Sequence, residues 1–113
     1  MVKIAIPVSG NLLSEKFGHC SHYEIIEIEK NAIKKRIQGN PPKSNPGEIY
    51  DWIALAGITD VVVHQIDKND ISFFADTKIN LFIGIKISSP EIIIDEYLKG
   101  TLKSDAKTIY QYK

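Results

Sequence analysis

The sequence contains very little cysteine and arginine. Among its 113 residues there is one cysteine, Cys20, and one arginine, Arg36. A single thiol excludes a disulfide within the chain, and it excludes a four-cysteine zinc or iron–sulfur site built by one chain. A single guanidinium excludes a phosphate clamp made of several arginines. The 14 basic residues balance 14 acidic residues, so the chain also lacks the charge of a general nucleic-acid binder.

Long hydrophobic runs are absent as well. No apolar stretch approaches the ~18 residues of a membrane span, and Met1–Pro7 has no basic region leading into an apolar run. We therefore expect neither a membrane segment nor a signal peptide. A lone thiol fits a reducing compartment, which favours a cytoplasmic protein. The length predicts one domain over residues 1–103, followed by a polar C-terminal tail over residues 104–113.

What the sequence does contain is an alternation of strand and helix patterns. Strands are predicted for five segments: Val2–Val8, Tyr23–Glu29, Ala32–Gln38, Ile58–Val63 and Ile79–Ile85. Helices are predicted from Pro46 to Gly57, from Asp67 or Asn69 to about Thr77, and from Ser88 or Ser89 to about Lys99. The order is βββαβαβα.

This order predicts a mixed α/β sheet of five strands. The first three segments have short connections, with a tight turn at Lys30-Asn31, so they should run antiparallel. The last two strands are apolar throughout and alternate with helices, which predicts parallel strands buried on both faces. Trp52 and Ile53 have the spacing of a helix face that packs on the sheet.

Candidate ligands gather at one end of this predicted sheet. Open α/β sheets bind ligands beyond the carboxyl ends of their parallel strands. The segments Ser9–Cys20, His64–Asp67 and Gly84 onward should all lie there. They carry the only cysteine and two of the three histidines, His19 and His64.

Each of these side chains has two interpretations. Cys20 is a soft metal ligand or a nucleophile, both of which require the thiolate, or it is a small buried apolar residue. His19 ligates metal or lowers the pKa of the thiol, or it is a histidine of a surface loop. His64 is a ligand, or it is a histidine at the edge of the core that bonds to backbone.

Several catalytic motifs are missing. The sequence has no P-loop, no GxGxxG, no HExxH and no GxSxG. Nucleases of the RNase H-like fold have a similar strand order, but they need metal-binding carboxylates on the first strand. Here Ser9-Gly10 stands at the corresponding end, so two-metal phosphodiester chemistry is not expected.

The sequence resembles the dinitrogenase iron–molybdenum cofactor biosynthesis family over about residues 2–102. The most specific part is the loop Phe17-Gly18-His19-Cys20. The other matching segments are Val2–Gly10, Leu13–Lys16, Pro46-Gly47, Asp51–Ile53, Leu55–Val63 and Asp95–Leu102. The resemblance implies an RNase H-like three-layer α/β fold. It also implies non-enzymatic handling of iron–sulfur or iron–molybdenum clusters.

The chain departs from the family pattern at two places. Lys16 stands where the family usually has a histidine before Phe-Gly. His64–Asp67 replaces a Gly-Gly-Ile-Gly turn, in which glycines let a cofactor approach backbone N–H groups.

Three hypotheses follow. The first is a carrier or accessory protein, not an enzyme, that binds a preformed cluster. Its metal ligands would be Cys20, His19 and His64, and the site would also include Phe17, Gly18, Ser9 and Gly10. One thiolate and one or two imidazoles are too few for a complete cluster site, so the cluster would be held loosely, or it would be shared across a homodimer or with an assembly or acceptor protein.

The second hypothesis is a degenerate, ligand-free module for protein interaction or regulation, monomeric or dimeric. The third is a hydrolase that uses Cys20 with one of the two histidines, although no orienting acid is evident near them in the sequence.

Overall fold

The computed structural model describes residues 2–17, 20–40, 46–66 and 68–104. In chain order its elements are β1 (Val2–Ser9), β2 (Leu12–Leu13), β3 (His22–Glu29), β4 (Ala32–Gly39), α1 (Pro46–Leu55), β5 (Asp60–Val62), α2 (Lys68–Ala75), β6 (Asn80–Phe82) and α3 (Pro90–Leu98). The strands form one mixed sheet in the order β4-β3-β1-β5-β6, with β2 paired to β1. β1, β5 and β6 are parallel, whereas β3 is antiparallel to both β1 and β4. The predicted strand directions are confirmed.

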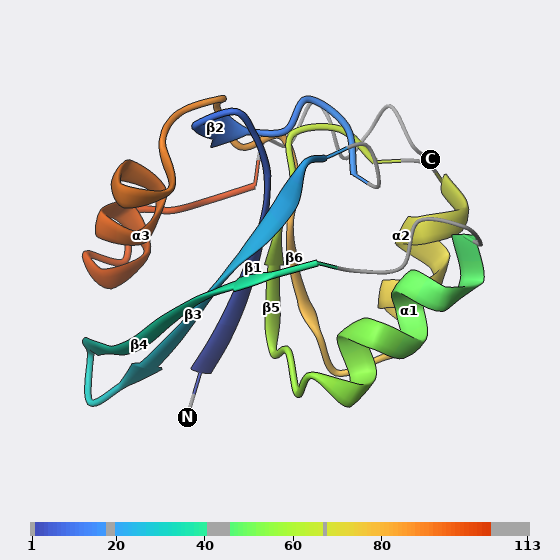
Figure 1. The fold of residues 1–113 in the computed structure, drawn as a ribbon, viewed down its shortest axis with the longest axis horizontal. Coiled ribbons are helices and arrows are strands. Elements are labelled where there is room, and N and C mark those ends of the chain that lie inside the picture. Colours follow the sequence, from blue (N-terminus) through green and yellow to red (C-terminus); the bar gives the residue numbers. More distant parts are fainter. Residues whose placement is uncertain (1, 18–19, 41–45, 67, 105–113) are drawn as a thin grey trace.

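The helices cover both faces of the sheet and create two cores. Figure 1 shows α3 on one side and α1 with α2 on the other. Because strand side chains alternate between faces, Ile4 and Ile6 pack in the core that contains Ile93 of α3. Ala5 between them packs in the core that contains Ile53 of α1. The molecule therefore has three layers.

The predicted number of strands was too low, because the sheet has six strands in the described part of the chain rather than five. The additional strand, β2, has two residues and pairs with Val8 and Ser9 of β1. A two-residue strand has no periodicity of its own. It is defined by the chain turning back after Gly10, which has a positive φ of 65°.

The turn between β3 and β4 has the predicted conformation, and one of the predicted helix caps is found. Lys30 and Asn31 both have positive φ, 54° and 61°, as a two-residue hairpin turn requires. Ser89 is the N-cap of α3 and accepts a hydrogen bond from the backbone of that helix. Asn69 does not cap α2, because it lies inside the helix. The other predicted cap, Asp67, lies outside the described residues.

The predicted packing of α1 is also found. Ile53 is fully buried, and Trp52 is half-buried against the same core. At the other end of the chain, the Ser104 hydroxyl accepts a hydrogen bond from the N–H of Ile83, and residues 105–113 lie outside the described part. None of the helices in the described part is both long and apolar enough to cross a bilayer.

Candidate functional site

The three segments expected at the carboxyl ends of the parallel strands do meet there. After β1, the backbone at Lys16 forms a parallel bridge with Gln65, which follows β5. The N–H of Phe17 donates to the carbonyl of Gln65 at 2.8 Å. After β6, the N–H of Gly84 donates to the carbonyl of His64 at 3.2 Å. Strand topology alone therefore located this end of the molecule correctly.

The loop that follows β1 is held in place by its own polar groups. Ser14 is buried, and its N–H donates to the carbonyl of Pro7 at 2.8 Å. The Ser14 hydroxyl donates to the carbonyl of Lys16 at 3.2 Å, and the Ser9 hydroxyl lies 3.5 Å from the Ser14 hydroxyl. These bonds fix the backbone that leads toward Cys20.

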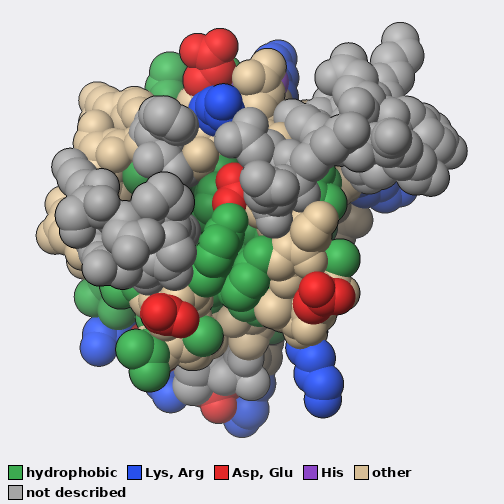
Figure 2. Space-filling view, turned by 90° about the vertical axis from the view of Figure 1, so that its right-hand side faces the viewer, with side chains coloured by type: hydrophobic (Ala, Val, Ile, Leu, Met, Phe, Trp, Pro, Cys, Tyr) green, Lys and Arg blue, Asp and Glu red, His purple; other side chains and the backbone are tan. Residues whose placement is uncertain are grey.

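Phe17 and Cys20 belong to the core under α1 and α2. Phe17 is buried, and its ring packs edge-on against the rings of Phe74 and Tyr23, with centroids 5.7 Å and 6.4 Å away. Cys20 is half-buried and packs against the same core. The N–H of Ser21 donates to the carbonyl of Val8 at 2.8 Å, which holds this segment beside the end of β1. Figure 2 shows the face formed by α1 and α2, with hydrophobic side chains at its centre.

His64 is oriented by a contact with the backbone. Its Nδ1 lies 2.9 Å from the carbonyl oxygen of Ile85. Because a carbonyl oxygen only accepts, Nδ1 carries the proton, and Nε2 of the neutral ring keeps its lone pair. Metal-binding histidines usually donate their other N–H to a carbonyl or carboxylate in this way. The contact is equally that of a histidine bonded to backbone at the edge of the core, so both interpretations of His64 agree with it.

The remaining predicted site residues lie in different places. Gly18 and His19 lie outside the described residues. Gly10 lines a hollow on the α3 side of the sheet, where Val8, His22 and Ser89 also lie. Phe17 and Cys20 pack on the opposite side of the sheet. The predicted site residues are therefore divided between the two faces of the sheet.

The described residues do not form a complete metal site by themselves. Residues 2–17, 20–40, 46–66 and 68–104 contain no group of three or more His, Cys, Asp or Glu side chains placed to hold a metal ion. Cys20 is the one thiol in the sequence. Its thiolate is a soft ligand of the kind that binds iron–sulfur clusters. A cluster bound to Cys20 would need further ligands in addition to the described residues near it.

The two departures from the family pattern are neighbours in space. Lys16 and Gln65 are the partners of the parallel bridge. The N–H of Gln65 donates to the carbonyl of Glu15 at 3.1 Å, so this amide is used within the protein. It is therefore not directed at an anionic ligand. The pairing of residues 49 positions apart has no local sequence signal.

Comparison with known proteins gives one family and a set of similar folds. Residues 1–100 match the model of a family described as dinitrogenase iron–molybdenum cofactor. An uncharacterized protein of Methanocaldococcus jannaschii is 31% identical over 108 residues, which cover 91% of each chain.

Two solved structures share the fold. The crystal structure of PH0822 has a TM-score of 0.84 and 22% identity, and the match covers 96% of this chain and 98% of that one. The apo form of the orange protein from Desulfovibrio gigas has a TM-score of 0.76 and 12% identity, with 94% of each chain covered. At these identities the two structures support the fold alone.

Proposed function

This chain belongs to the dinitrogenase iron–molybdenum cofactor family, and from that premise we propose that it binds and carries a preformed cluster of the iron–sulfur or iron–molybdenum type. The cluster is cargo, and the protein is an accessory to metallocluster biosynthesis rather than an enzyme. The strand order β4-β3-β1-β5-β6 between two helix layers supports the RNase H-like classification that we infer for the fold.

The observation that carries this proposal is the meeting of the loop that leads to Cys20 with the segment that contains His64. The bridge between Lys16 and Gln65 joins the two segments, and the contact of His64 with Ile85 leaves Nε2 with a lone pair. Cys20 supplies the thiolate, which binds iron strongly, and His64 supplies a second, weaker ligand. His19 follows from the sequence as a third ligand.

An incomplete ligand set suits a carrier. A cluster held by one thiolate and one or two imidazoles keeps open coordination positions that an assembly protein, an acceptor protein or a second copy of the chain can fill. Few bonds must then break when the cluster is passed on. A resident cofactor would instead require a closed set of ligands.

The second candidate function is a ligand-free module for protein interaction or regulation. The observation that favours it is the occupied amide of Gln65, which bonds to Glu15. A cluster that approached this turn would not find the backbone N–H groups that a glycine-rich turn offers.

Anaerobic reconstitution with ferrous iron and sulfide separates the two functions. Bound iron and the absorbance of the cluster are measured for wild type, Cys20→Ser and His64→Ala. His22→Ala is the control, because His22 lies in β3 and lines the hollow near α3. Carriage predicts that Cys20→Ser abolishes uptake, that His64→Ala weakens it less, and that His22→Ala leaves it unchanged. Equal uptake by wild type and Cys20→Ser would remove this site. Uptake by neither protein would favour the ligand-free module.

A further inference from the structure

A groove separates α3 from the hairpin of β3 and β4. It consists of two adjoining hollows of about 200 Å³ and 430 Å³. Both are lined by Arg36 of β4 and Glu91 of α3, so they meet at this pair. We call the two hollows together the α3 groove. It lies on the face of the sheet opposite the core that contains Phe17 and Cys20.

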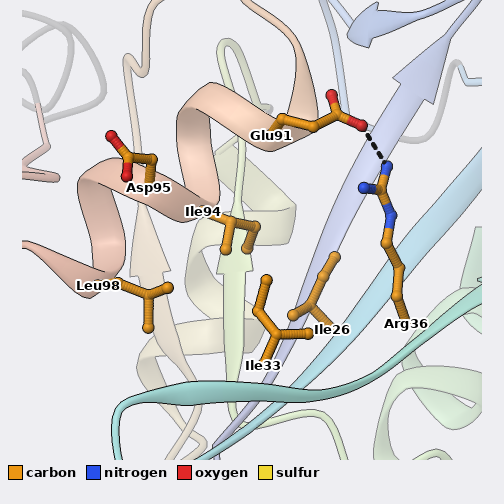
Figure 3. A pocket seen from close by; sticks show the side chains of 7 residues that line it. All are labelled: Ile26, Ile33, Arg36, Glu91, Ile94, Asp95 and Leu98. Carbon is orange, nitrogen blue, oxygen red and sulfur yellow. Dashed lines mark ion pairs between the residues drawn. The ribbon is translucent and has the colours of Figure 1, made fainter.

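The smaller hollow is apolar and has the size of one side chain. Figure 3 shows Ile94 and Leu98 of α3 pointing toward Ile26 and Ile33 of the hairpin across the open space. Ile33 is 51% exposed, so this wall of the hollow faces solvent. An aliphatic cavity of roughly 150 Å³ accepts benzene, so a hollow of this size fits one aromatic or branched side chain.

The larger hollow carries an excess of negative charge. Arg36 Nη2 lies 2.9 Å from Glu91 and 3.4 Å from Glu24, so one guanidinium serves two carboxylates. The N–H of its own residue and the Arg36 guanidinium lower the pKa of Glu91, which keeps this carboxylate ionised at neutral pH. Asp95, at the rim of the smaller hollow, pairs with Lys99 at 2.9 Å. The larger hollow thus holds two carboxylates and one guanidinium, and Nε2 of His22 lies 3.6 Å from Glu24.

The size of the smaller hollow and the charges of the larger one indicate what the α3 groove binds. We propose that the α3 groove docks a segment of a partner protein in which a bulky apolar side chain stands next to a lysine or arginine. The apolar side chain fills the smaller hollow, and its basic neighbour approaches the exposed carboxylate of Glu91 from the solvent side. Asn11, Gln38 and Ser89 line the larger hollow and offer hydrogen-bonding groups to the backbone of the segment. Exposed apolar surface with a polar rim is typical of protein-binding sites.

Three blocked dipeptides test the proposal on the full chain labelled with ¹⁵N. Acetyl-Phe-Lys-amide is titrated against acetyl-Phe-Glu-amide and acetyl-Gly-Lys-amide, and amide shifts are followed by NMR. We expect saturable shifts at Ile26, Ile33 and Ile94 with the Phe-Lys probe, with a dissociation constant in the range of about 1 mM. The Phe-Glu probe should bind at least tenfold more weakly, and the Gly-Lys probe should give no saturable shifts at these residues.

Charge reversal gives the sharper comparison. Glu91 is 63% exposed, so Glu91→Lys should fold, and it should reverse the preference between the Phe-Lys and Phe-Glu probes. Asp51→Lys is the matched control, because Asp51 is exposed on α1 at the other face of the sheet, and it should leave the preference unchanged. The proposal is overturned if wild type gives no saturable shifts in the groove, if it does not distinguish Phe-Lys from Phe-Glu, or if Glu91→Lys keeps the wild-type preference.

Discussion

Gly39, at the end of β4, is in close contact with the only tryptophan. A Cβ atom built at this position would lie 2.8 Å from Cζ2 of Trp52 and 2.9 Å from Cδ1 of Ile25. Both distances are shorter than packed carbon atoms allow, so Gly39→Ala must displace the indole ring or the buried isoleucine. Overpacking of this kind costs typically about 1–3 kcal/mol, and the loss of glycine's freedom in the unfolded chain returns about 0.5–1 kcal/mol. We expect a net destabilisation of about 1 kcal/mol.

A double-mutant cycle isolates the contact. Trp52→Phe removes the nearest ring atoms but leaves the contact with Ile25, so Gly39→Ala should cost less in that background, with a coupling energy of roughly 0.5–1 kcal/mol. Chemical denaturation measures the free energy of unfolding of all four proteins, and Trp52 fluorescence reports displacement of the ring in Gly39→Ala. Gln38→Ala, at the exposed neighbouring position, is the control. If Gly39→Ala lowers the free energy of unfolding equally in the wild-type and Trp52→Phe backgrounds, the inferred contact between α1 and β4 is wrong.

Three further predictions concern single contacts. Ser89→Ala should destabilise the protein by about 1 kcal/mol in thermal unfolding through loss of the α3 N-cap, whereas Ser89→Asn should not. His64→Ala should cost about 1 kcal/mol, because the carbonyl of Ile85 loses its donor, and an unchanged melting temperature would contradict this contact. The pKa of Glu91 is lowered in the folded protein by its own N–H and by Arg36, so its stabilising contribution is present at neutral pH and is lost as the pH falls below 4.5. The difference in unfolding free energy between wild type and Glu91→Gln should therefore shrink in acid, and a constant difference would refute the assignment.

Local signals in the sequence predicted those parts of the fold that local physics controls. The turn at Lys30-Asn31 and the cap at Ser89 each depend on a few neighbouring residues, and both are found. The parallel directions of β5 and β6 follow from apolar runs that alternate with helices. The predicted strand Ile58–Val63 was longer than the observed Asp60–Val62, because Ile58 and Val63 are apolar through burial in the core rather than through membership of the strand.

The arrangement of the site depended on contacts that local patterns do not encode. That the loop after β1 meets the segment after β5 followed from topology, and the bond between Phe17 and Gln65 agrees. The turn back at Gly10 creates β2 and places Gly10 beside α3, away from Cys20. The bridge between Lys16 and Gln65 likewise joins distant positions, and a single sequence gives no signal for it.

The proposal that the protein carries a cluster bound through Cys20 is tested most directly by the metal content of the protein as purified from cells. Wild type and Cys20→Ser are purified in parallel without oxygen, and iron, molybdenum and acid-labile sulfide are measured per chain. We predict that wild type retains iron and sulfide and that Cys20→Ser contains neither above background. Equal metal content in the two proteins, or a metal-free wild type, would contradict the account.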